Sequence, residues 1–227
     1  MSLRFPATWC ATDLGVHRPS HGTYERYPYE GLPALDASAF TGSFAWFGDL
    51  GPIVDEQVAV MNLFAAGLAQ YGLALPRDFV TFQTHAKLSR MLDKVSVTCC
   101  WSSLSRPMAS PVEPGAYLVR FLRDQQDCAF WYLYLRPSAE AFVVHSYELA
   151  EHLDYLEPDE GFGSDDEDPP ELDPVDLATK IYWCAPSFEQ FAYRFWIENR
   201  IWTKLHGDPA VGLAPAERQY MDHYNIP

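Results

Sequence analysis

The chain has 227 residues, of which 48% are apolar and 15% aromatic, so its composition indicates a hydrophobic core and argues against an intrinsically disordered protein. This length suits one domain, or one domain with an extension, and buries enough surface to need no disulfide or metal staple. The 31 acidic and 16 basic residues give a formal net charge of −15, which argues against the basic stripe of a nucleic-acid-binding protein.

Residues 1–50 are rich in turn-forming proline and glycine, yet aromatic residues recur among them. We therefore predict an irregular N-terminal extension that packs on the domain. It lacks the continuous apolar stretch of an export signal. The longest apolar stretch of the chain, Ala59–Leu75, is interrupted by Asn62, Gln70 and two glycines, so we expect no membrane span and a soluble, cytoplasmic protein.

Two helices are predicted to follow the extension. Apolar residues from Val54 to Leu68 recur at spacings of three and four, which indicates an amphipathic helix over about Asp55–Tyr71. Gly72 follows as a C-terminal stop. Pro76 is suited to open a second helix, to which Phe79 and Phe82 supply an apolar face.

A block of strands comes next in the sequence. We predict strands at Val95–Trp101, Tyr117–Arg123, Cys128–Leu135 and Ala141–Tyr147. Because the last three are joined by short turns, they should be antiparallel neighbours in one sheet. The strand at Cys128–Leu135 is apolar on both faces, which favours a central, covered position over an exposed aromatic strip.

The negative charge is concentrated in an acidic insert, residues 148–176, which holds 13 acidic residues and no Lys or Arg. The rest of the chain then has 18 acidic residues against 16 basic ones. Prolines and glycines interrupt the insert, so we expect a solvated segment that contributes little to the core. We predict that it steers a basic protein partner, with a solubilising linker as the alternative. The residues expected to contact the partner are Asp159, Glu160, Asp165, Asp166, Glu167 and Asp168.

The clearest local signal lies after a short strand predicted at Lys180–Cys184. Ser187 and Gln190 fit a capping box, and aromatic residues then follow one face of a helix that ends at Gly207. Phe188, Phe191 and Phe195 begin that face. A last helix is predicted from Pro215 to near Tyr224.

The search for catalytic, cofactor and metal motifs finds no phosphate loop, nucleophile elbow or zinc-binding helix. The five cysteines match no zinc spacing, and we expect them to be buried and reduced. The acidic insert lacks the ligand spacing of a calcium loop. We predict no cofactor, no metal and no catalytic residue. The remaining enzymatic alternative pairs Cys99 or Cys100 in space with His85 or His145.

Two short motifs carry a family resemblance. Leu75–Phe79 reads Leu-Pro-Arg-Asp-Phe at the start of a predicted helix, and Ser187–Phe191 reads Ser-Phe-Glu-Gln-Phe after a predicted strand. With three antiparallel strands between them, these motifs resemble the SUKH superfamily, which includes fungal cell-wall synthesis regulators and many bacterial toxin-immunity proteins. The family's glycine-rich turn after the first motif is absent, since Val80–Leu92 contains no glycine.

The resemblance implies an α+β fold with an antiparallel (mixed) sheet of about four to six strands and helices packed on it. We expect the extension at residues 1–50, then a single domain at 51–227 that carries the acidic insert. The function it implies is a non-catalytic protein-binding module of the bacterial toxin-immunity type, which neutralises a cationic toxin domain. An adaptor with a peptide or small-molecule pocket and a cysteine-dependent enzyme are the alternatives.

Overall fold

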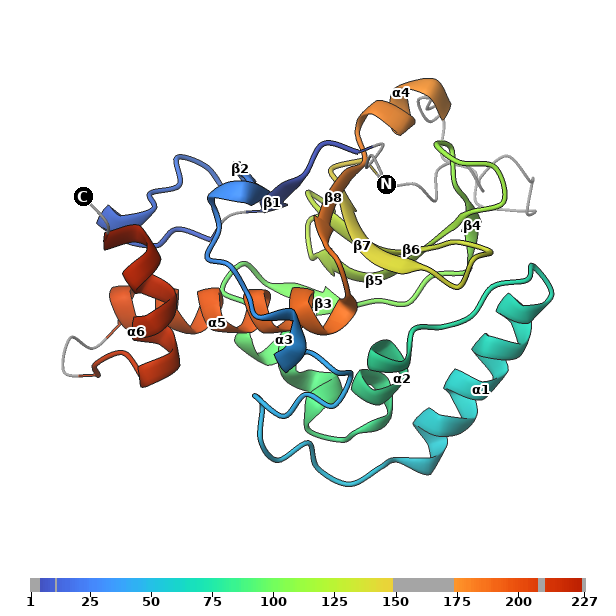
Figure 1. Ribbon diagram of the computed structural model, residues 1–227, viewed down its shortest axis with the longest axis horizontal. Helices are drawn as coiled ribbons and strands as arrows, with labels where there is room; N and C mark the ends of the chain where they lie inside the picture. Colours follow the sequence, from blue (N-terminus) through green and yellow to red (C-terminus); the bar gives the residue numbers. More distant parts are fainter. Residues whose placement is uncertain (1–4, 11, 149–173, 208–210, 226–227) are drawn as a thin grey trace, which may run out of the picture.

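The computed structural model describes residues 5–10, 12–148, 174–207 and 211–225, and it confirms the α+β class. Within these ranges one six-stranded antiparallel sheet has the strand order β3-β5-β6-β7-β8, with β4 also paired to β5 (Figure 1). The strands are β3 (Cys100–Ser102), β4 (Met108–Ala109), β5 (Tyr117–Asp124), β6 (Phe130–Leu135), β7 (Ala141–Ser146) and β8 (Tyr182–Ala185).

Helices pack around this sheet. Among the described residues, no helix has both the length and the apolar character needed to cross a membrane. The helices are α1 (Asp55–Ala69), α2 (Arg77–Thr84), α3 (Met91–Val95), α4 (Pro174–Thr179), α5 (Phe188–His206) and α6 (Pro215–Asp222).

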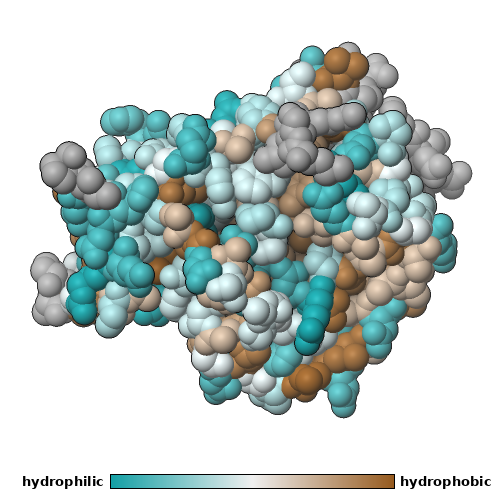
Figure 2. All heavy atoms as spheres, in the orientation of Figure 1, coloured by the Kyte–Doolittle hydropathy of each residue, from teal (hydrophilic) through white to brown (hydrophobic). Residues whose placement is uncertain are grey.

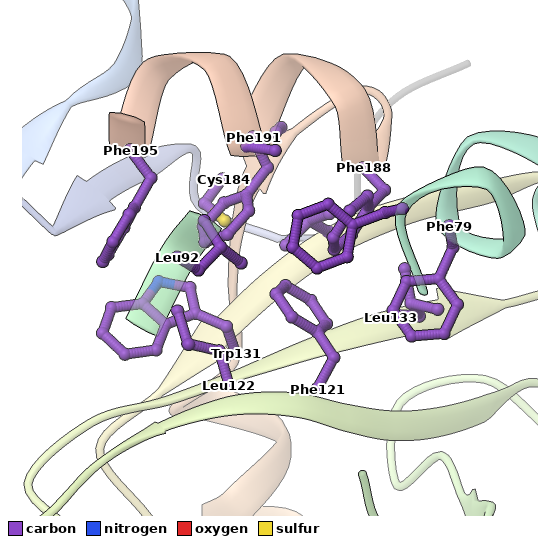
Figure 3. Close-up of a cluster of buried hydrophobic side chains, with 14 of the residues drawn as sticks. Phe79, Leu92, Phe121, Leu122, Trp131, Leu133, Cys184, Phe188, Phe191 and Phe195 are labelled. Carbon is purple, nitrogen blue, oxygen red and sulfur yellow. The ribbon is translucent and has the colours of Figure 1, made fainter. Parts of the chain in front are cut away.

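Helix α5 packs across one face of the sheet, as the aromatic spacing predicts. The Ser187 side chain accepts a hydrogen bond from the Gln190 backbone N–H at 3.2 Å, so it caps the helix as expected. Figure 3 shows Phe188 and Phe191 pointing from α5 toward the strands below. The Phe188 ring lies 5.0 Å from that of Phe121 on β5 and 4.9 Å from that of Phe79 on α2, in edge-to-face contact.

The opposite face of the sheet is also covered. Strand β6 is buried along its whole length, which confirms the predicted central strand. Tyr132 and Tyr134 on this face join a second apolar cluster with Phe5 of the extension, Leu177 of α4 and Trp183 of β8. The alternative of an exposed aromatic strip on β6 is therefore wrong.

The extension is mostly irregular, but it contains a two-stranded antiparallel sheet of β1 (Thr8–Cys10) and β2 (Arg26–Pro28). An isolated parallel bridge joins Ala7 to Trp183, and the Trp183 backbone N–H donates to the Pro6 carbonyl at 3.0 Å. The first strand of the extension thus lies beside the β8 edge of the main sheet (Figure 1).

Two local predictions are corrected by the structure. The strand expected at Val95–Trp101 forms only from Cys100, as β3, because Val95 ends α3 and Cys99 has a φ of +58°, a left-handed conformation that interrupts an extended strand. The cysteines were expected to be buried, but Cys99 and Cys128 are exposed. All five, each within the described ranges, carry free thiols.

The packing of α5 predicts which of its residues limit stability. Phe191 is fully buried, so Phe191→Ala should lower the free energy of unfolding by about 3–5 kcal/mol, through lost transfer energy and a cavity. Ser187→Ala loses one capping hydrogen bond and should cost about 1 kcal/mol. Urea unfolding of both variants checks the order, and a larger loss for Ser187→Ala would contradict it.

Candidate functional site

The extension is anchored to α5 by a buried carboxylate, Glu198. It accepts hydrogen bonds from the Trp9 indole at 2.8 Å and from both terminal nitrogens of Arg18 at 2.8 and 2.7 Å. The Tyr220 hydroxyl of α6 donates to it at 2.6 Å. Burial by itself raises the pKa of Glu198, but Arg18 and the hydrogen bonds outweigh it and hold the pKa below its usual value. Glu198 therefore joins three chain segments as an anion.

A second buried carboxylate, Glu189, holds another part of the extension. It accepts the backbone N–H groups of Gly42 at 2.5 Å and of Phe44 at 2.6 Å, and the Trp46 indole N–H at 3.2 Å. The backbone N–H of Glu189 itself donates to Asp78 at 2.8 Å. The starts of α2 and α5, where the two motifs of the family resemblance lie, therefore meet through Asp78.

These anchors shape an open groove of about 550 Å³ between residues 33–46, α5 and α6, which we call the aromatic groove. Its aromatic residues include Phe40, Trp46 and Tyr193, each partly exposed. The Tyr193 ring lies 5.3 Å from the Phe40 ring and 5.1 Å from the Trp46 ring, both in edge-to-face geometry. In Figure 1 the segment after β2 passes in front of α5, with α6 beside it.

The charge of the aromatic groove is negative. Asp36 and Asp222 are exposed and line it, and no Lys or Arg is found among its described lining residues. Hydrogen bonds from the Ser38 hydroxyl and backbone N–H lower the pKa of Asp36, which stays ionised at neutral pH. Its volume falls in the range of about 300–1,000 Å³ that is typical of ligand sites. Aromatic rings beside carboxylates are suited to organic cations.

A second hollow, of about 380 Å³, lies where Cys10 and residues 12–24 cross the sheet and α5. Cys10 and Trp131 line its buried side, while Asp13 and His21 are among its more exposed lining residues. The Cys10 thiol lies 3.3 Å from His145 Nδ1, and the Thr8 hydroxyl lies 2.8 Å from His145 Nε2. A thiol and an imidazole are thus paired, but not the pair that the sequence suggested.

The electrostatics of the Cys10–His145 pair keep it neutral. Burial raises the pKa of the Cys10 thiol far above its usual value. Burial also lowers the pKa of His145 to about 3, with a smaller contribution from the positive charge of Arg26. A nucleophilic cysteine needs a thiolate, which a nearby imidazolium stabilises. At neutral pH the pair therefore contains neither a thiolate nor an imidazolium, and it acts as a buried hydrogen bond between two neutral groups.

Among the described residues, none of the Cys–His pairs of the enzymatic alternative is joined by a hydrogen bond. Cys100 lies 3.4 Å from the Tyr24 hydroxyl and 3.5 Å from that of Thr98. His85 donates through Nδ1 to the Thr81 carbonyl at 2.8 Å. His145 does form a thiol contact, but with Cys10 of the extension.

The predicted partner-contacting residues, from Asp159 to Asp168, lie outside the described residues. In the ranges that the structure does describe, no cluster of three or more His, Cys, Asp or Glu side chains could hold a metal ion. Sequence reasoning missed the aromatic groove, since its parts are Asp36–Trp46, Tyr193 and Asp222, which are far apart in the chain. The recurrence of aromatic residues in the extension was its only signal.

Helix α1 exposes apolar side chains, with Ile53 just before the helix 60% exposed, Val60 57% and Leu63 78%. Figure 2 shows hydrophobic surface gathered at the lower right of the molecule, in the region of α1. The face has no charged residue between Gln57 and Ala69, so it offers no charge complementarity to a partner.

Comparisons with protein-family models, curated proteins and solved structures found no match to this chain.

The buried imidazole predicts a pH dependence of stability. His145 has a pKa of about 3 in the folded chain and of about 6.5 when unfolded, so between these values the unfolded state binds the extra proton. The contribution of the neutral His145 side chain to the free energy of unfolding is therefore present above about pH 6.5, and it is lost as the pH falls below that value. Between pH 7 and pH 5 the wild type should lose about 2 kcal/mol through it.

Urea unfolding of wild type and His145→Gln at these two pH values measures the effect. The variant should lose about 2 kcal/mol less than the wild type between them. His21→Gln, at an exposed histidine, is the matched control and should behave as the wild type. Equal losses in wild type and His145→Gln would contradict the assignment.

Proposed function

We propose that this chain is a non-catalytic protein-binding module that holds a basic partner in the aromatic groove. The observation that carries the proposal is the lining of the groove, where Phe40, Trp46 and Tyr193 lie beside the carboxylates of Asp36 and Asp222. Binding sites are commonly apolar and aromatic hollows with a few placed polar groups, and this groove has that composition. The sign of its charges selects a cationic partner.

The neutral Cys10–His145 pair supports a binding function over the cysteine-enzyme alternative. A thiol that is 8% exposed as a residue, with its pKa raised by burial, is a poor nucleophile. The contacts of both groups are explained by anchoring β1 to β7. This pair therefore contributes to the fold that positions the groove.

The acidic insert fits the same proposal as an electrostatic guide. Its 13 acidic residues would attract a basic protein over a longer range than the two carboxylates of the groove. Under the SUKH resemblance, the partner is a cationic toxin domain and the chain is its immunity protein. The groove supplies the contact, and residues such as Asp165 and Asp168 raise the rate of encounter.

Affinity capture from the native cell tests the proposal with two charge-matched variants. Asp36→Asn/Asp222→Asn removes the carboxylates of the groove, and asparagine at position 36 keeps a side chain that can cap the following turn. Asp55→Asn/Glu56→Gln removes the same charge from the exposed start of α1 (Figure 1). Mass spectrometry identifies the proteins that each form retains.

We expect one basic protein to be retained by the wild type and by the α1 variant and to be depleted about tenfold by the groove variant, as for a loss of about 1.4 kcal/mol. Retention of the same protein by all three forms would contradict the assignment of the groove. Retention of acidic proteins alone would contradict the basic partner.

A further inference from the structure

We infer that Phe40, Trp46 and Tyr193 form a seat for a single organic cation, the lysine or arginine side chain of a protein partner. This inference rests on the proposed function, and it assigns the contact chemistry to three rings. Tyr193 is the central ring, because its centroid lies within 5.3 Å of both others. Contacts with these three rings can compensate a bound cation for the water molecules that it loses on entering the groove.

Phe40 and Trp46 each pack edge to face against Tyr193 and are not stacked on it. The Phe40 and Tyr193 planes meet at 62°, and the Trp46 and Tyr193 planes meet at 79°. At these separations the rings are in contact with one another, and each residue is partly exposed, so a cation in the groove can lie over the ring surface that the neighbouring rings leave open. Because the face of an aromatic ring carries partial negative charge, a cation within about 6 Å of a ring centroid is attracted to it.

The seat is held in place before any ligand arrives. Glu189 binds Trp46 through the indole N–H and fixes the backbone on its N-terminal side through Gly42 and Phe44. Tyr193 lies on α5 next to Arg194, which donates to the Pro33 carbonyl at 3.1 Å and to the Tyr220 hydroxyl at 2.9 Å. A preorganised site loses less conformational entropy on binding.

The exposed charges around the seat are negative, whereas the buried charges beneath it are not. Arg194 is buried below the groove, and the nearby anion Glu198 is already paired with Arg18, so these three buried groups carry one net positive charge. The exposed carboxylates of Asp36 and Asp222 remain as the charges on the groove lining. A cation that enters therefore meets π faces at the rings and carboxylates at the surface, and both attract it.

The groove has room for the residues that flank a basic side chain as well as for its charged head. A space of about 550 Å³ is larger than an ammonium or guanidinium head requires. The groove is lined along one side by residues 33–40 and along the other by α6, so the residues that flank a basic side chain can also make contact. Flanking contacts of this kind are how a partner protein would gain affinity beyond that of one cation.

Nuclear magnetic resonance of the Trp46 indole N–H tests the seat directly. The probes are Nα-acetyl-Nε-trimethyllysine methylamide, its neutral tert-butyl analogue, and tetramethylammonium chloride, titrated at constant ionic strength. The charged lysine probe should shift the Trp46 signal to saturation, with an affinity at least about tenfold above that of the neutral analogue. Equal affinities, or no saturable shift with any cation, would overturn the inference.

Two matched variants separate ring chemistry from folding. Phe40→Leu keeps an apolar side chain but removes a ring, so it should weaken the charged probe about tenfold and leave the neutral one unchanged. Tyr193→Phe keeps the ring and should bind as the wild type. Unchanged signals of the other tryptophan indoles verify the fold. A Phe40→Leu variant that binds the charged probe at wild-type affinity would overturn the inference.

The results also distinguish this inference from the proposed function. Saturable binding of the cation without capture of any basic protein would refute the protein-binding function. A preference for tetramethylammonium over the lysine probe would identify a free small cation as the ligand, and it would overturn the assignment of the seat to a protein side chain. Capture of a basic protein that is insensitive to Phe40→Leu and to competition by the lysine probe would overturn the seat and leave the function standing.

Discussion

The structure depends on two carboxylates that α5 carries into the interior, Glu189 and Glu198. They are nine residues apart, which is two and a half turns at about 3.6 residues per turn, so they leave opposite sides of the helix. Each is satisfied mainly by groups from the extension: Glu198 by Trp9 and Arg18, Glu189 by the backbone at Gly42 and its neighbours. The extension therefore wraps α5 and forms part of the domain.

A buried anion is costly, and it is stable only when all its partners are in place. That constraint explains how a segment with little regular secondary structure is anchored to α5. The same constraint links distant regions of the chain. The Tyr220 hydroxyl of α6 and the Trp9 indole of the extension both donate hydrogen bonds to Glu198. The aromatic groove lies between these tied elements, so its geometry depends on interactions that no ligand touches.

The sheet and α5 could be predicted from the sequence because their signals are local. The short turns at Arg123–Asp127 and Arg136–Ser138 require antiparallel neighbours, and the spacing of Phe188, Phe191 and Phe195 defines a buried helix face. Strand β4 and helix α4 were not predicted, because one has two residues and the other begins inside an acidic, proline-rich segment.

The candidate site could not be predicted, because it is assembled from residues without a local pattern. The sequence identifies the helix that carries Glu189 and Glu198 by its cap and its aromatic face, and nothing in the spacing of the two carboxylates identifies Trp9 or Gly42 as partners. The Cys10–His145 contact joins residues 135 positions apart. By contrast, the Phe79 and Phe188 motifs were expected to pack on the sheet, and they do so in contact with each other.

The most direct test of this account is hydrogen exchange and urea unfolding of Glu198→Gln. This variant keeps the side-chain volume but leaves the Arg18 guanidinium buried without its counter-charge. It should lose about 3–5 kcal/mol of stability, with faster exchange in residues 5–20 and in α6. Glu113→Gln, which breaks the partly exposed pair with Arg136, should lose at most about 1 kcal/mol. A Glu198→Gln variant as stable as this control, with exchange altered only within α5, would contradict the claim that this carboxylate holds the extension in place.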